Sequence, residues 1–153
     1  MPLQIKLILY YIWLMINTAL SQFGTRELQG PEANNPRIIE YFQEIGHIWV
    51  KTDETAWCSA FVNWVAKTNG YEHSGKLNAR SWLDVGQPVA IPKQGDVVIL
   101  WRIAKKDWRG HVGFYVNETD THVHILGGNQ SNKVCIKPYP KERLLGYRRL
   151  RKV

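Results

Sequence analysis

Two side chains of this 153-residue sequence have the types and surroundings of a nucleophile and its base. Cys58 lies in residues 57–61 (WCSAF), near the predicted start of an amphipathic helix. Unpaired N–H groups at a helix start favour a thiolate and can receive a developing oxyanion. His111 lies in residues 110–114 (GHVGF), at the start of a predicted strand. A cysteine and a histidine so placed are the pair that thiol catalysis requires.

Each member of this pair also has a simpler explanation. Free cysteines are usually buried and inert, and a lone histidine at a strand end is commonly just solvated. The chain has a second cysteine, Cys135, so Cys58 could instead form a disulfide with it. Two cysteines without a CxxC motif are too few for a disulfide scaffold.

The predicted hairpin limits which residue could orient the imidazole of His111. A four-residue turn at 117–120 would bring Asn129 just past the position opposite His111. An amide oxygen there could accept the imidazole proton and fix the tautomer, as in Cys-His-Asn enzymes. We therefore predict Asn129 as the third residue, although a turn role would suit it equally. The alternative is His124, which would lie about 7 Å along the strand.

The elements that must position these residues change from helices to strands near residue 90. Asn35 and Pro36 are typical of a helix start, and a second helix is predicted from near Asp53 to Gly70. A short third helix is expected at 78–84. Strands are predicted at 97–101, 111–116, 121–126, 134–136 and 144–149. This order predicts an α+β domain with its N-terminal helices packed against a bent antiparallel sheet.

The chain is basic, with a net charge of +7 and a pI near 9.5. A basic surface favours anionic partners, and the clearest cluster is residues 148–152 (RRLRK). No zinc-finger, helix-turn-helix or aromatic RNA-binding pattern accompanies it, so charge alone does not predict nucleic-acid binding. His122 and His124 could both ligate a metal, but no matching pair lies elsewhere in the sequence. We predict no metal or other cofactor.

The first 21 residues have two interpretations. Residues 7–16 (LILYYIWLMI) form an apolar run that is too short to span a bilayer as a stable helix. Small residues at Ala19 and Ser21 fit a signal-peptidase site, but the segment could equally begin the first helix of the domain. We expect residues 1–12 to be an apolar segment of uncertain role and residues 13–153 to be one domain.

Taken together, the motifs resemble those of NlpC-type and CHAP cell-wall hydrolases. Residues 57–62 (WCSAFV) are similar to the helix start that holds the nucleophile in NlpC-type peptidases. Residues 110–114 are similar to the His-Val-Gly strand of both groups. A group of short bacterial and phage proteins is more similar still, through residues 53–64, 79–83, 126–132 (LGGNQSN), 138–140 and 145–148. The likeness runs from about residue 19 to residue 149.

This resemblance implies a papain-like fold and hydrolysis of peptidoglycan amide bonds by Cys58 and His111. It also favours the domain-helix interpretation of residues 19–24 over a signal peptide. NlpC-type enzymes usually carry Asp before the nucleophile where this chain has Trp57, so their substrate subsites do not transfer. Their third residue is often a histidine on the following strand, which keeps His124 as an alternative.

We therefore expect an endopeptidase or N-acetylmuramoyl-L-alanine amidase that acts on peptidoglycan. It would work as a monomer at the cell wall, in the periplasm or outside the cell, without an integral membrane span. The alternatives are a catalytically inactive wall-binding module and, with less support, a basic nucleic-acid-binding protein.

Overall fold

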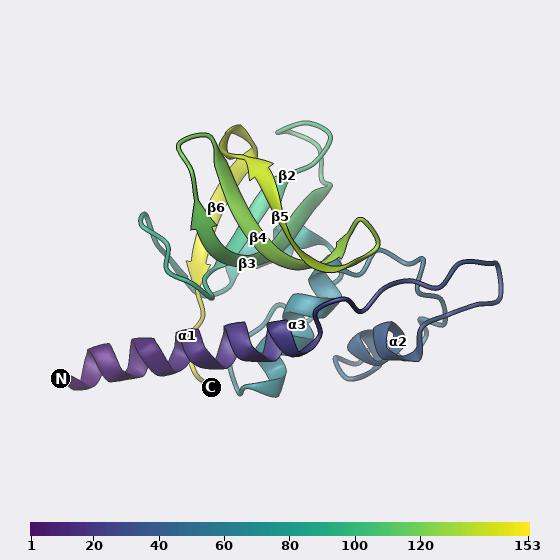
Figure 1. The fold of residues 1–153 in the computed structure, drawn as a ribbon, viewed down its shortest axis with the longest axis horizontal. Coiled ribbons are helices and arrows are strands. Elements are labelled where there is room, and N and C mark those ends of the chain that lie inside the picture. Colours follow the sequence, from purple (N-terminus) through teal and green to yellow (C-terminus); the bar gives the residue numbers. More distant parts are fainter.

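The computed structural model describes residues 1–153 and confirms an α+β fold. Helices gather on one side of a single sheet, as Figure 1 shows. The helices are α1 (Leu3–Ser21), α2 (Pro36–Gln43) and α3 (Cys58–Thr68), with short 3-10 helices η1 (Ala79–Asp84) and η2 (Lys141–Arg143). The strands are β1 (Gln87–Pro88), β2 (Val97–Trp101), β3 (Gly110–Glu118), β4 (His122–Gln130), β5 (Lys133–Pro140) and β6 (Leu144–Arg149).

The six strands form one antiparallel sheet in the order β1-β6-β2-β3-β4-β5. The pairing register shifts within three strand pairs, including β3 with β4 and β4 with β5. Such bulges bend a strand and increase its twist. The predicted bent sheet is therefore present, and one of its bulges, in β4, lies beside the candidate site.

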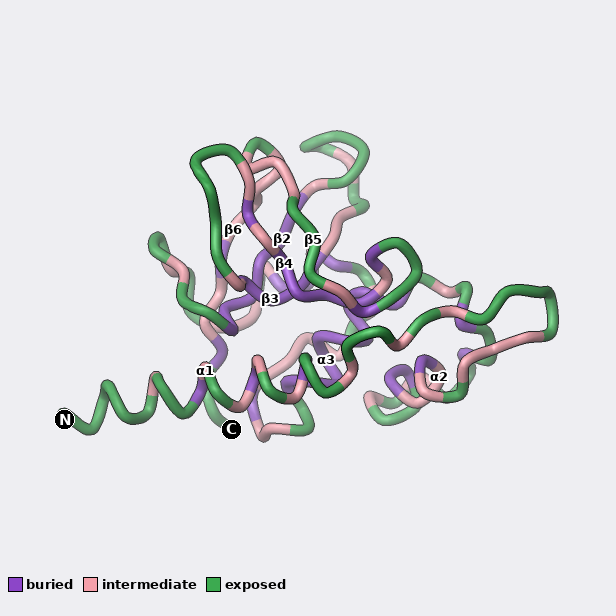
Figure 2. Tube along the Cα trace, viewed as in Figure 1, coloured by how far each residue is buried: buried purple, intermediate pink, exposed green.

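The main core lies between the helices and the sheet and is built around α3. Every residue of α3 from Cys58 to Ala66 is buried, as expected for a helix enclosed on all sides. Figure 2 shows the same burial along the inner parts of β3 and β4. A smaller cluster, including Leu100, Tyr115 and Ile125, covers the opposite face of the sheet.

Only the C-terminal part of α1 packs against the domain. Tyr11, Met15 and Ala19 are buried, and the Tyr11 hydroxyl donates a hydrogen bond of 2.7 Å to the Gly95 carbonyl. The first turns extend beyond the domain, with Leu3 72% exposed (Figure 1). The helix is continuous across residues 12 and 13. By length and composition α1 could cross a membrane, a property that core helices and N-terminal signal sequences share.

The capping residue of α2 was predicted correctly, whereas the hairpin register was not. Asn35 caps α2 by accepting a hydrogen bond of 2.9 Å from the Arg37 N–H, and Pro36 is its first residue. β3 continues to Glu118 and the turn lies later in the chain than predicted, so Phe114 pairs with Leu126. This register differs by three residues from the predicted one, and β4 continues to Gln130 instead of ending at 126.

Candidate active site

Cys58 is the first residue of α3, with Trp57 at the N-cap position. The sequence predicted a helix that begins near Asp53, four or five residues earlier. That prediction was wrong, because the Asp53 carboxylate binds other backbone groups and does not cap α3. It accepts hydrogen bonds from the backbone N–H groups of Leu28 (2.9 Å) and Asn35 (2.8 Å) and so joins two loops. Because α3 begins at Cys58, the thiol lies closer to the unpaired N–H groups of the helix start than the sequence predicted.

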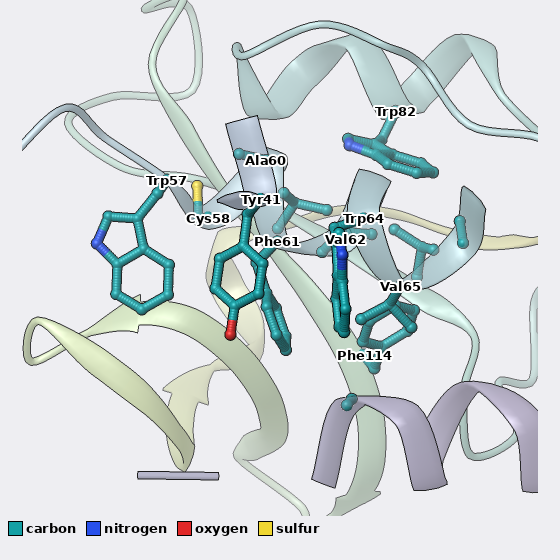
Figure 3. Packing of buried hydrophobic residues seen from close by; sticks show 14 of the residues in the cluster. Tyr41, Trp57, Cys58, Ala60, Phe61, Val62, Trp64, Val65, Trp82 and Phe114 are labelled. Atoms are coloured by element: carbon teal, nitrogen blue, oxygen red, sulfur yellow. The ribbon is translucent and has the colours of Figure 1, made fainter. Parts of the chain in front are cut away.

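The Cys58 thiol lies at the margin of the aromatic core. Figure 3 shows its sulfur next to Trp57, whose indole N–H donates a hydrogen bond of 2.8 Å to Glu27. Burial raises the pKa of the Cys58 thiol, while backbone N–H groups of Val112 and Ser59 act in the opposite direction. Burial has the larger effect, so the isolated thiol is protonated at neutral pH.

His111, at the start of β3, is held by Gln130 at the end of β4. Its Nε2 lies 2.9 Å from the Gln130 Oε1. The Gln130 amide nitrogen donates to the carbonyls of Ile125 (3.1 Å) and Cys135 (2.7 Å), which can only accept. The amide oxygen must therefore face the imidazole, and Nε2 must carry the proton. Nδ1 is left as the ring nitrogen that can act as a base.

Gln130, and not Asn129 as the sequence predicted, is thus the residue whose amide oxygen accepts a hydrogen bond from His111. Asn129 lines the same cleft, but it makes no hydrogen bond to His111 and has a positive φ of 55°. The register of β4 and β5 shifts between Gly127 and Gln130, and this bulge turns the Gln130 side chain toward the imidazole. The sequence could have suggested Gln130, because it directly follows Asn129 in the same LGGNQS motif and also carries a side-chain amide.

His124 also makes no contact with His111. It pairs with Asn117 on one side and Pro138 on the other, and its Nδ1 is buried without a partner. His122 donates to or accepts from the Thr121 hydroxyl at 2.8 Å. No group of three or more His, Cys, Asp or Glu side chains that could hold a metal ion is present.

Two glycines make the close packing around this site possible. A Cβ at Gly127 would lie 2.6 Å from the Gln130 Oε1, the atom that contacts His111. A Cβ at Gly128 would lie 2.7 Å from the Trp57 ring and 2.8 Å from the Phe61 Cβ. The Gly-Gly pair therefore leaves room both for the Gln130 amide that contacts His111 and for the Trp57 ring.

Burial of both side chains favours their neutral forms and opposes a resting thiolate–imidazolium pair. Burial lowers the pKa of His111 to about 4, and the positive charges of Arg102 and Lys137 lower it further, against the hydrogen bond to Gln130, which raises it. With the raised pKa of Cys58, both groups are uncharged near neutrality. In a thiol-catalysed reaction at this site, proton transfer from sulfur to imidazole would then be part of the reaction.

Cys58 and His111 line one cleft of about 410 Å³. One wall carries Tyr139, whose ring stacks on the imidazole with centroids 5.0 Å apart. Trp101 and the 70%-exposed Trp108 line it as well. The aromatic residues before His111 thus form walls of the candidate site.

Both cysteines are free thiols in the structure. Cys135 lies behind Gln130, and its thiol donates to the Gln130 backbone carbonyl at 3.4 Å. Cys135 thus contacts Gln130, the residue hydrogen-bonded to His111, and is not bonded to Cys58.

The basic C-terminal cluster is partly committed to the fold. The Arg148 guanidinium donates to the Leu83 carbonyl at 3.0 and 3.1 Å. Arg149 forms a bidentate pair with the buried carboxylate of Asp96, at 2.6 and 2.9 Å. Arg148 and Arg149 thus have structural roles within the fold, so their presence does not require an anionic binding partner outside the chain.

The structure is similar to two solved structures of low sequence identity. One is a protein from Staphylococcus aureus subsp. aureus Mu50, described as similar to a lipoprotein and of the NLP/P60 family, at a TM-score of 0.53 and 17% identity. The other is an NlpC/P60 family protein from Bacillus cereus ATCC 10987, at a TM-score of 0.54 and 17% identity. The matches cover 92% and 90% of this chain but only 41% and 39% of those chains.

No protein-family model matches the sequence, and no curated protein matches it. The likeness therefore lies in the fold, and this chain spans about two fifths of the length of the two solved proteins. It confirms the papain-like α+β architecture: the chain has the fold of NlpC/P60 family proteins.

Proposed function

We propose that this chain is a cysteine hydrolase that cleaves amide bonds in the peptides of bacterial peptidoglycan. The observation that carries the proposal is that Cys58, first in α3, and His111, held by Gln130, line the same cleft. The shared fold of NlpC/P60 proteins supports a cell-wall peptide as substrate. The bond cut would be either a peptide bond of the stem or the N-acetylmuramoyl-L-alanine amide.

In the first half of the reaction, His111 Nδ1 accepts the proton of the Cys58 thiol as the sulfur attacks the amide carbonyl. The imidazolium that forms is stabilised through its Nε2–H bond to Gln130. Unpaired N–H groups at the start of α3 are the available donors for the oxyanion. His111 then protonates the departing amine, and a thioester on Cys58 remains.

In the second half, water hydrolyses the thioester. Neutral His111 accepts a proton from the water as its oxygen attacks the carbonyl. The C–S bond breaks, the carboxylic acid leaves and the proton returns to the sulfur. Gln130 keeps the ring in one tautomer through both halves, because its amide nitrogen stays bonded to two carbonyls.

The test is incubation of the purified chain with purified cell-wall sacculi, followed by mass spectrometry of the released fragments. Wild type should release soluble fragments whose new termini identify the bond that is cut. Cys58→Ser should keep the fold and wall binding but release none. Undiminished release by Cys58→Ser would refute the role of the thiol, and wall binding without release by wild type would favour an inactive binding module.

A further inference from the structure

The charged side chains that line the candidate cleft are all cationic. They are Arg102, Arg109, Lys137 and Arg143, and no Asp or Glu lines the cleft with them. They come from separate parts of the chain: the end of β2, the residue before β3, β5 and η2. The fold thus brings together four positive charges that form no cluster in the sequence.

The four charges differ in how far protein groups already neutralise them. Arg109 pairs with Asp107 through hydrogen bonds of 2.7 and 2.9 Å, so its charge is locally balanced. Arg102 is exposed and forms no hydrogen bond or ion pair. Lys137 donates only to the neutral hydroxyl of Ser131, at 3.3 Å. Two of the charges are thus free to bind an anion.

Arg143 is the third free charge, and part of it is buried. Its guanidinium lies over the Trp101 ring, 5.4 Å from the centroid. Its Nε is buried and has no hydrogen-bond partner. A buried donor without an acceptor is costly, so a ligand oxygen at this place would remove a penalty as well as add a bond.

Two of these charges lie close enough to Cys58 and His111 to change their pKa values. Arg102 lowers the pKa of both Cys58 and His111, although burial is the larger cause in each. Lys137 also lowers the pKa of His111. Arg143 and Arg102 act on Tyr139, the ring that stacks on His111. These positive charges therefore lie in the same cleft as Cys58 and His111 and near enough to act on them.

We propose that Arg102, Lys137 and Arg143 form a carboxylate-binding subsite beside Cys58, so that the preferred substrate carries a free carboxylate close to the scissile amide. This inference rests on the proposed function and names its substrate class. Guanidinium groups bind carboxylates through paired hydrogen bonds, and the aromatic walls would contact the apolar parts of the same peptide. A carboxamide in place of the carboxylate would leave the three cations unpaired.

The experiment compares native sacculi with sacculi whose carboxylates have been converted to carboxamides by carbodiimide coupling with ammonia. Loss of one charge-assisted hydrogen bond corresponds to a rate about 10- to 100-fold lower. We expect wild type to release fragments from amidated walls at least about tenfold more slowly. Arg102→Gln and Arg143→Gln should slow release from native walls and lose the discrimination.

Lys106→Gln is the matched control, because Lys106 is exposed in the same loop as Arg102 but does not line the cleft. It makes the same change in net charge and should keep both the rate and the discrimination. Equal release from native and amidated walls by wild type would overturn the subsite. So would an equal effect of Lys106→Gln and Arg102→Gln.

A binding assay separates failure of this inference from failure of the proposed function. Cys58→Ala cannot turn over, so its co-sedimentation with native and amidated sacculi reports binding alone. We expect weaker binding to amidated walls, and a smaller difference when Arg102→Gln is added than when Lys106→Gln is added. No release by wild type, with this binding pattern intact, would refute hydrolysis but keep the subsite. Equal binding to both walls would refute the subsite.

Discussion

The protonation state of His111 decides the pH range in which the proposed enzyme works. Burial and the charges of Arg102 and Lys137 lower the pKa of His111 to about 4. The imidazole is therefore neutral, and able to act as a base, at any pH well above 4. Activity should be lost only as the pH falls through about 4, below the pKa near 6.5 of a free histidine.

The measurement is the pH profile of kcat/KM, which reports the groups of the free enzyme. The acid limb should lie nearer to 4 than to 6.5. Lys137→Gln removes a positive charge that disfavours the imidazolium, so it should move this limb to higher pH. A wild-type limb at or above 6.5 would contradict the neutral resting pair.

The proposed orienting role of Gln130 gives a second prediction at the residue scale. Gly127→Ala would place a Cβ 2.6 Å from the Gln130 Oε1 and push the amide away from His111 without altering either side chain. Misplacement of a catalytic group by about 1 Å can cost about 10²-fold in rate. We expect a loss of this order in kcat/KM for both Gly127→Ala and Gln130→Ala.

Asn129→Ala is the comparison for these variants, because Asn129 lines the cleft without contacting His111. It should retain more activity than Gln130→Ala. If Asn129→Ala were the more impaired of the two, the orienting role would return to Asn129. Far-UV circular dichroism of each variant checks that the loss is not one of folding.

At the scale of the elements, capping chemistry was readable from the sequence and strand register was not. The Asn35-Pro36 start of α2 follows from local hydrogen bonding alone, which the sequence carries. The start of α3 depends on contacts between Asp53 and distant loops. The bulge that selects Gln130 over Asn129 depends on pairing between β4 and β5. Long-range contacts of this kind have no signal in a local pattern.

The loop contacts of Asp53 lead to a prediction about stability. Asp53 is fully buried and accepts hydrogen bonds from two backbone N–H groups, so Asp53→Ala leaves both donors without their acceptor. A hydrogen bond to a charged group contributes about 1.5–3 kcal/mol. We expect Asp53→Ala to lower the free energy of unfolding by about 3 kcal/mol, measured by urea denaturation.

Glu54→Ala is the matched control, since Glu54 is the exposed neighbour of Asp53 and also carries one negative charge. Exposed substitutions of this kind usually change stability by less than about 0.5 kcal/mol. Similar losses in the two variants would show that charge, and not the loop contacts, accounts for the effect.

At the scale of the whole molecule, α1 divides into a part that belongs to the core and a part that does not. Met15 is fully buried, whereas Leu7 is 57% exposed. Truncation of a buried methionine costs about 2–5 kcal/mol. Met15→Ala should therefore lower the free energy of unfolding by that amount, and Leu7→Ala should change it by less than about 0.5 kcal/mol.

Urea denaturation of the two variants checks this division. An equal, large loss for Leu7→Ala would mean that the first turns of α1 are packed in solution. The sequence predicts Leu7 in the apolar segment 1–12 and Met15 in the domain 13–153, although the apolar run continues without interruption across that boundary. Only the packing of α1 against the rest of the fold shows which of its turns are buried.

The position of β6 has a consequence for how the protein is made. This strand is the last of the six in sequence order, yet it lies between β1 and β2, the second place in the sheet. A ribosome has already synthesised Cys58 and His111 before it reaches residues 144–149. Until then β1 has no partner and one side of β2 is unpaired. Premature termination before residue 144 would therefore yield a polypeptide with Cys58 and His111 but an incomplete sheet to hold them. The sheet that holds Cys58 and His111 therefore cannot be completed until residues 144–149 have been synthesised.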